Sequence, residues 1–200
     1  MLSEVKELHK NSHGHWHYVR KRRTVIAKVN ANQIIAAQIF TVVVSIVGGM
    51  VLESYKIQVA AFAGALVLYP GVIDLIASVA GALGAKVNHH LETTSYKKRS
   101  ILINDTLFAL VVSGLASVVL GLAAFLLGSI LSDVSAKDII MLSVLTVLSV
   151  GFVLYPLLSL LVVAFRKLKL NPDNLIGPIE SSVVDVVATI AFVLIISNIL

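Results

Sequence analysis

Three carboxylates lie inside strongly apolar stretches of the sequence: Asp74, Glu180 and Asp185. A carboxylate at membrane depth is energetically costly, so it normally faces a bundle interior or an aqueous path. Oxygen ligands without sulfur suit hard cations, and Mg²⁺ binds through one or two carboxylates while it keeps several waters. Mn²⁺ or Ca²⁺ would accept nearly the same ligands. The alternative is that these carboxylates are protonated or hydrogen-bonded and serve packing alone.

Small and hydroxyl-bearing residues accompany two of these carboxylates at helical spacing. Ser181, Asp185 and Thr189 recur every four residues, which predicts one polar stripe on an otherwise apolar helix. Around Asp74, residues at intervals of three or four form a second small and polar face, in which small residues permit close helix packing or leave room for water. Its members are Gly71, Asp74, Ser78, Gly81 and Ala85.

The overall composition indicates the type of fold that holds these residues. Of the 200 residues, 58% are hydrophobic and 14% are charged, against roughly 25% charged in a typical soluble domain. A soluble globule of this size has no way to bury so much apolar surface. The chain is therefore predicted to be an integral, multi-pass protein of the cell membrane, in contact with the lipid bilayer. In a membrane protein, Lys and Arg are typical of cytoplasmic loops, so the basic composition does not indicate nucleic-acid binding.

Five apolar stretches approach or exceed the length of about 20 residues that crosses a bilayer. The sequence thus predicts an all-α, polytopic fold of five transmembrane helices. Two stretches contain Leu-Tyr-Pro with an internal proline, Pro70 and Pro156, which predicts kinks. The stretches are 34–52, 57–87, 106–131, 139–165 and 175–200.

The Lys and Arg residues indicate the orientation. Fourteen of the 16 precede the first stretch or lie in the second and fourth loops, whereas the first and third loops hold only Lys56 and Lys137. The positive-inside rule places the N-terminus in the cytoplasm and the C-terminus outside. We therefore expect a basic cytoplasmic segment over 1–33 and a membrane domain over 34–200.

The remaining polar motifs have ordinary explanations. The sequence has no cysteine, which excludes thiolate metal sites and Cys nucleophiles. The run His13-x-His15-x-His17 suits a transition metal, but a solvated tail is the favoured interpretation. His89 and His90 follow the second stretch, either at a cytoplasmic mouth or in a plain loop. Asp105 opens the third stretch, where helix capping is the expected role.

The segment from Asn171 to Asp185 reads Asn-Pro-Asp-Asn-Leu-Ile-Gly-Pro-Ile-Glu-Ser-Ser-Val-Val-Asp. It resembles the last transmembrane helix of the MgtE family, which includes bacterial magnesium channels and related eukaryotic solute-carrier magnesium transporters. The family pattern there is a Pro-Asp-Asn-like lead, a proline, two small or hydroxyl residues and an aspartate. The five-span count is also similar, so the resemblance extends over about 34–200.

This resemblance implies a divalent-cation path between the second and fifth helices of a homodimer. The family's pore aspartate falls on Asp185 and its second-helix proline on Pro70. Its asparagine position falls on Ser78, and Asp74 stands where a small residue is usual. A single membrane domain, where eukaryotic relatives carry two, implies the homodimer.

We therefore predict a transporter or channel for Mg²⁺, or for Mn²⁺ or another divalent cation, and not an enzyme. Asp185 is the main candidate ligand and Asp74 the second. Two other classes of protein stay open: a non-transporting membrane scaffold or accessory subunit, and an intramembrane aspartyl protease, whose Gly-x-Gly-Asp signature is missing. The further candidate ligands are Ser181, Ser78 and Glu180.

Overall fold

The computed structural model describes residues 4–10, 16–22, 31–62, 64–93, 99–130, 133, 135–168, 170 and 172–199. The chain divides into two compact units, Met1–Ala31 and Asn32–Leu200. The second unit contains all the apolar helices and all five candidate ligands.

The first unit contains a β-hairpin, where the sequence suggested a solvated tail. Strand β1 (Glu4–Lys10) pairs antiparallel with β2 (Trp16–Arg22), in a register that runs from Glu4 opposite Arg22 to Lys10 opposite Trp16. Valine, tyrosine and tryptophan favour strands. His13 and His15 lie outside the described residues.

Over its described residues, the second unit contains helices joined by turns and no strand. Five of its helices are long and apolar enough to cross a membrane, which confirms the predicted all-α, five-helix fold. The sixth is a short helix between the first two spans. The helices are α1 (Ala31–Ser54), α2 (Lys56–Ala61), α3 (Ala65–Thr93), α4 (Arg99–Gly128), α5 (Ala136–Lys167) and α6 (Pro172–Ile199).

The second apolar stretch, predicted over 57–87, is divided into two helices. The short helix α2 ends before Phe62, and the chain then passes through Gly64, whose φ of 81° is in the left-handed region that glycine tolerates best. Helix α3 begins at Ala65 and continues past Pro70 to Thr93. Hydropathy alone did not reveal this break, because the residues around it are also apolar.

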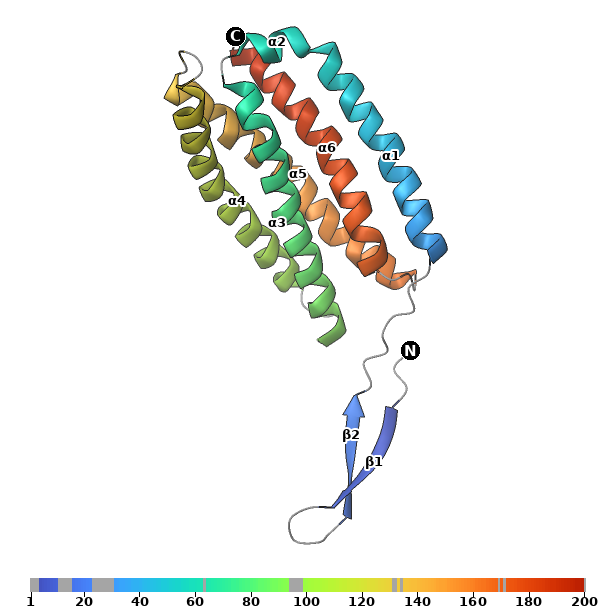
Figure 1. The fold of residues 1–200 in the computed structure, drawn as a ribbon. Helices are drawn as coiled ribbons and strands as arrows, with labels where there is room; N and C mark the ends of the chain where they lie inside the picture. The colour runs from blue at the N-terminus through green and yellow to red at the C-terminus, as the bar shows by residue number, and fades with distance from the viewer. Residues whose placement is uncertain are drawn as a thin grey trace. The chain divides into compact units, whose positions relative to one another are not determined.

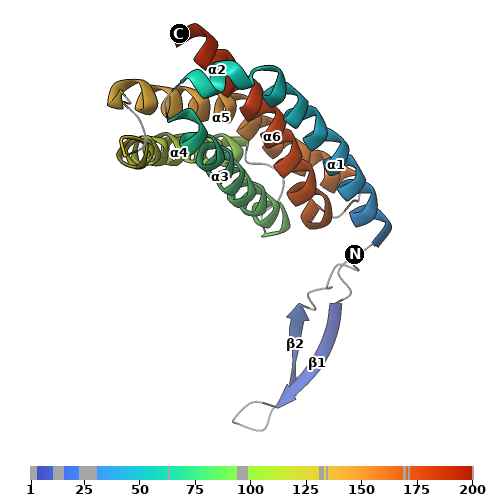
Figure 2. The ribbon, with the colours of Figure 1, turned by 45° about the horizontal axis from the view of Figure 1, so that its top comes forward.

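Helices α3, α4, α5 and α6 form the bundle, and α1 lies along α6 (Figures 1 and 2). Helix α5 packs against α3, α4 and α6, so it carries much of the core. Helix α1 is exposed over most of its apolar surface, as expected for a helix that faces lipid. Core side chains that are fully buried include Leu68, Ile76, Leu142, Val147, Tyr155 and Phe192.

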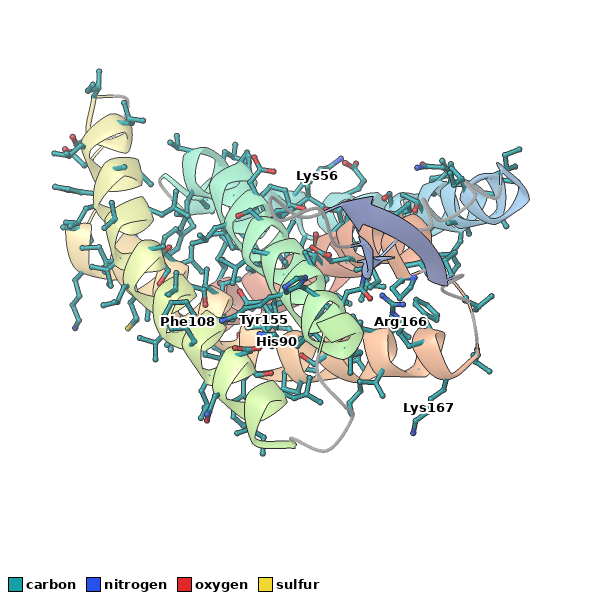
Figure 3. All side chains as sticks on the ribbon, turned by 90° about the horizontal axis from the view of Figure 1, so that it is seen from below. Lys56, His90, Phe108, Tyr155, Arg166 and Lys167 are labelled. Carbon is teal, nitrogen blue, oxygen red and sulfur yellow. The ribbon has the colours of Figure 1, made fainter. Side chains whose placement is uncertain are left out.

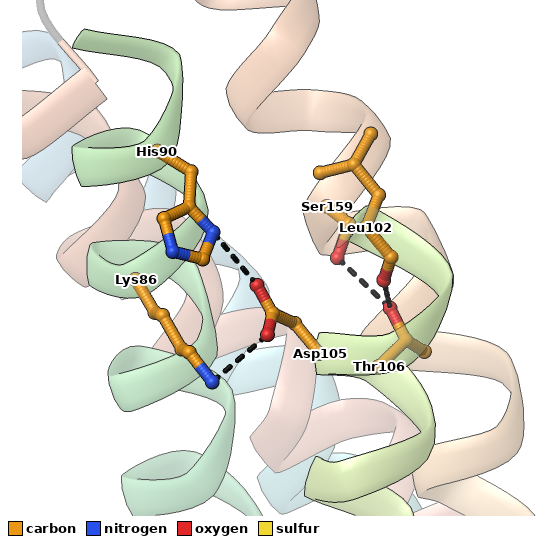
Figure 4. Close-up of polar contacts among 6 residues, drawn as sticks. All are labelled: Lys86, His90, Leu102, Asp105, Thr106 and Ser159. Atoms are coloured by element: carbon orange, nitrogen blue, oxygen red, sulfur yellow. Dashed lines mark hydrogen bonds and ion pairs between the residues drawn. The ribbon is translucent and has the colours of Figure 1, made fainter. Parts of the chain in front are cut away.

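A polar cluster around the buried Asp105 joins α3 to α4 at the end where both helices approach the second loop. Asp105 on α4 lies 2.8 Å from Nζ of Lys86 and 3.0 Å from Nδ1 of His90, both on α3 (Figure 4). Helix α4 begins at Arg99, so Asp105 lies in its second turn and does not cap it. The capping prediction was wrong because the polar residues before Asp105 also belong to the helix.

Helix α5 contributes cations to the same end of the bundle. Nε of Arg166 donates to Oδ1 of Asn88 on α3 at 2.8 Å, whereas the Lys167 side chain points away from the bundle (Figure 3). Cations in the last turn complement the partial negative charge of a helix C-terminus. At the other end, the hydroxyl of Ser135 caps α5 by accepting from the backbone N–H of Asp138.

Candidate functional site

The main candidate ligand, Asp185, lies in the middle of α6 and is partly buried. Its Oδ2 accepts a hydrogen bond from Oγ of Ser45 on α1, at 3.4 Å. The carboxylate therefore lies where α6 meets α1, and it keeps partial access to the surface of the chain.

The second candidate, Asp74, lies on the exposed face of α3. Ser78, one turn further along, is also exposed, and its hydroxyl donates to the carbonyl of Leu75 at 3.1 Å. Helices α3 and α6 pack against each other, so Asp74 and Asp185 lie on neighbouring helices although they are more than 100 positions apart in the sequence.

The backbone carbonyl of a proline, about two turns before Asp185 on α6, accepts hydrogen bonds from several hydroxyl groups. The C=O of Pro178 accepts from the hydroxyls of Ser181 at 3.1 Å, Ser182 at 3.0 Å and Thr41 at 2.8 Å. Ser181 is partly buried and Ser182 is buried. The candidate ligand Ser181 thus uses its hydrogen on its own helix and presents oxygen lone pairs to any neighbour.

Glu180 is in a different environment from the other candidates. It is buried, with 4% of its surface exposed, and its carboxylate lies against α3 at Gly81. A Cβ at position 81 would lie 3.3 Å from Oε1, so glycine makes room for the acid. Glu180 therefore lies between α3 and α6, whereas Asp74 and Ser78 are on an exposed face.

Residues that the sequence interpretation did not select also contact the site. They are Thr41 and Ser45 on α1 and Tyr69 on α3, whose hydroxyl lies 2.7 Å from that of Thr189. A signal for α1 exists in the sequence, because Thr41, Ser45 and Gly48 follow helical spacing on an apolar helix. No signal in a single sequence predicts that this face of α1 meets α6.

The candidate carboxylates and hydroxyls can act as hard oxygen ligands for a cation, but one chain supplies few of them. Among the described residues, no group of three or more His, Cys, Asp or Glu side chains gathers into a metal cage. Two carboxylates with hydroxyls nearby fit a cation that retains most of its water, as Mg²⁺ does. Such a site is incomplete within a single chain.

The helices and these carboxylates define a multi-pass membrane protein with acidic residues inside its spans, the type of protein that moves ions. A family model described as MgtE, divalent cation transporter, matches residues 69–195. The chain belongs to the MgtE family. Comparisons with curated proteins and with solved structures found no match.

Membership of this family confirms three of the predictions made from the sequence. The protein is a multi-pass membrane protein, its class is divalent cation transport, and it belongs to a family of transporters rather than enzymes. The matched region begins at Tyr69 in α3 and ends within α6, so it includes Asp74, Ser78, Glu180, Ser181 and Asp185.

Proposed function

We propose that the protein transports Mg²⁺ along a path between α3 and α6 of a homodimer, with Asp185 as the main ligand. The observation that carries this proposal is that two neighbouring membrane-spanning helices each carry a carboxylate that the single chain leaves at least partly exposed, Asp74 on α3 and Asp185 on α6. Ser78 and Ser181 supply hydroxyls that hydrogen-bond to waters of the ion. Glu180 reaches an ion only if α3 and α6 separate, because it is buried between them.

The exposure of Asp74 supports the homodimer. An acidic side chain inside a span that faces lipid is strongly unfavourable, so the face that carries it must meet protein or water. A second copy related by a two-fold axis would cover this face and double the number of carboxylates. Four carboxylates then surround one hydrated cation, which neutralises part of their mutual repulsion.

Oxygen chemistry and charge favour Mg²⁺ over softer metals. None of the candidate ligands is sulfur or imidazole, the ligands that Zn²⁺ and Cu²⁺ prefer. Mn²⁺ remains a plausible second substrate on the same chemistry. The orientation with residues 1–33 in the cytoplasm belongs to the same proposal and depends on the distribution of Lys and Arg.

Asp185→Asn tests the central assignment, because it keeps the shape of the side chain and removes its charge. We expect Mg²⁺ flux into proteoliposomes to fall by at least about tenfold, since a charged ligand is lost from a low-dielectric site, while the protein still assembles. Asp133→Asn, at an exposed position outside the helices, is the matched control and should transport normally. Wild-type flux from Asp185→Asn would overturn the assignment.

Measuring Mg²⁺ flux also distinguishes a transporter from a scaffold, since a wild-type protein that is only a scaffold would produce no flux. The homodimer is tested by reconstitution at high dilution, one chain per vesicle. A single chain that transports at the full rate would contradict the two-fold path.

A further inference from the structure

Helix α1 touches the rest of the bundle along one narrow face. Its large apolar side chains are exposed around most of its circumference, for example Ile39 at 62% and Val43 at 58%. The face toward α6 carries small and hydroxyl-bearing residues instead. In order along the helix these are Ala37, Thr41, Ser45 and Gly48.

Three successive positions on this face contact α6 near Asp185. The hydroxyl of Thr41 donates to the carbonyl of Pro178 at 2.8 Å, and that of Ser45 donates to Oδ2 of Asp185 at 3.4 Å. At Gly48, an added Cβ would meet Cγ2 of Val186 at 3.4 Å. The closest approach of α1 is therefore centred on the acidic residue.

The Ser45 hydroxyl differs from those of other helix serines in its acceptor, which is a carboxylate and not a backbone carbonyl. Serines inside helices commonly donate to a carbonyl of the preceding turn. Ser54 on the same helix does so to Met50 at 2.8 Å, and Ser197 does so to Val193 at the same distance. Ser45 instead directs its hydrogen across to a carboxylate on another helix.

We infer that Ser45 is a positioning residue for the cation site: its hydroxyl holds Oδ2 of Asp185 and leaves Oδ1 directed to the ion. This inference rests on the proposed function of Asp185. A hydrogen bond to a charged acceptor is strong and directional, so it restricts the rotation of the carboxylate. Helix α1 thereby forms one wall of the site without supplying a carboxylate.

The test compares Ser45→Ala with Ser54→Ala in the full-length protein, reconstituted for Mg²⁺ flux. Loss of one hydrogen bond to the ligand should raise the Mg²⁺ concentration for half-maximal flux about three- to tenfold and leave the maximal rate unchanged. Ser54→Ala should behave as wild type. Ser45→Thr retains the hydroxyl and should restore the wild-type half-saturation.

A second measurement makes the test independent of flux. Mg²⁺ that binds the folded protein raises its unfolding temperature in detergent, and the concentration required reports affinity. Ser45→Ala should need more Mg²⁺ for the same rise. In the Asp185→Asn background, Ser45→Ala should have no further effect on the remaining response, because the charged ligand that Ser45 positions is gone.

The outcomes distinguish this inference from the proposed function. If Asp185→Asn abolishes the Mg²⁺ response and Ser45→Ala leaves it unchanged, Ser45 does not position the ligand and only the inference fails. A lower maximal rate or yield with unchanged half-saturation would show that Ser45 serves packing alone, which also overturns it. If Asp185→Asn itself responds like wild type, the proposed function fails.

Discussion

The hydroxyl of Tyr69 on α3 lies 2.7 Å from that of Thr189 on α6, one turn beyond Asp185. Thr189 donates its single hydrogen to the backbone carbonyl of Asp185, so Tyr69 is the donor in the pair. The ring of Tyr69 also packs edge-to-face on Phe192, with centroids 5.2 Å apart. These contacts fix α3 against α6 beside the main candidate ligand.

Tyr69→Phe should weaken this connection and keep the ring contact. The loss of one partly buried hydrogen bond costs about 1 kcal/mol of stability, seen as a lower unfolding temperature in detergent. Affinity for Mg²⁺ should also fall, because the backbone at Asp185 is less restrained. Tyr55→Phe, in the turn before α2, is the control, and equal behaviour of the two variants would show that the Tyr69 hydroxyl is dispensable.

Asp74→Ala should reduce Mg²⁺ affinity without abolishing transport, since Asp185 remains. The expected increase in the half-saturating concentration is about three- to tenfold, the effect of removing one charge at partial solvent exposure. Flux assays over a range of Mg²⁺ concentrations measure it, with Asp133→Ala as control. Unchanged affinity and selectivity would make Asp74 structural and leave a path with one aspartate per chain.

Gly121→Ala should destabilise the packing of α4 on α5. An added Cβ would lie 2.8 Å from Cα of Ile140, a backbone atom that cannot move aside. Overpacking of this kind costs about 1–3 kcal/mol. Gly49→Ala is the matched control, because nothing lies within 4 Å of its new methyl. Unfolding in detergent should therefore separate the two variants, and equal stability would contradict the close approach.

Asp105→Asn should destabilise the end of the bundle where α3 meets α4. The side chain of Asp105 is only 9% exposed, and the substitution removes the charge that lies against Lys86 and His90. Because Lys86 and His90 retain access to solvent, we expect a cost of about 1–3 kcal/mol, below that of a fully buried pair. Glu53→Gln breaks the exposed pair with Lys56 and should change stability by less than about 0.5 kcal/mol.

The sequence was sufficient for the membrane helices, since length and apolar composition decide which segments cross a bilayer. It was insufficient where residues of similar hydropathy differ in conformation. Gly64 lies between two helices inside an apolar run, where its positive φ marks the break. The hairpin of β1 and β2 was missed because its strands are short and rich in charged residues.

For the site, the sequence supplied the acidic residues but not their neighbours. Asp74 and Asp185 are conspicuous because charges are rare in the spans. The partners of Asp185 are not, since Ser45 is 140 residues away and resembles any other helix serine. Tyr69 is likewise 120 residues from Thr189. Contacts of this range depend on how the helices pack, which a single sequence does not encode in any local pattern.

The attachment of α1 to α6 has a consequence for the biogenesis of the protein. The contacts from Thr41 and Ser45 span 137 and 140 residues, so α1 enters the membrane well before its neighbour has been synthesised. Because most of its surface is apolar, α1 is stable in lipid as a separate helix, and it associates with α6 only after both helices are inserted. The wall that holds Asp185 therefore closes only when the ribosome has completed α6, and a nascent chain interrupted before that point leaves α1 without its partner helix.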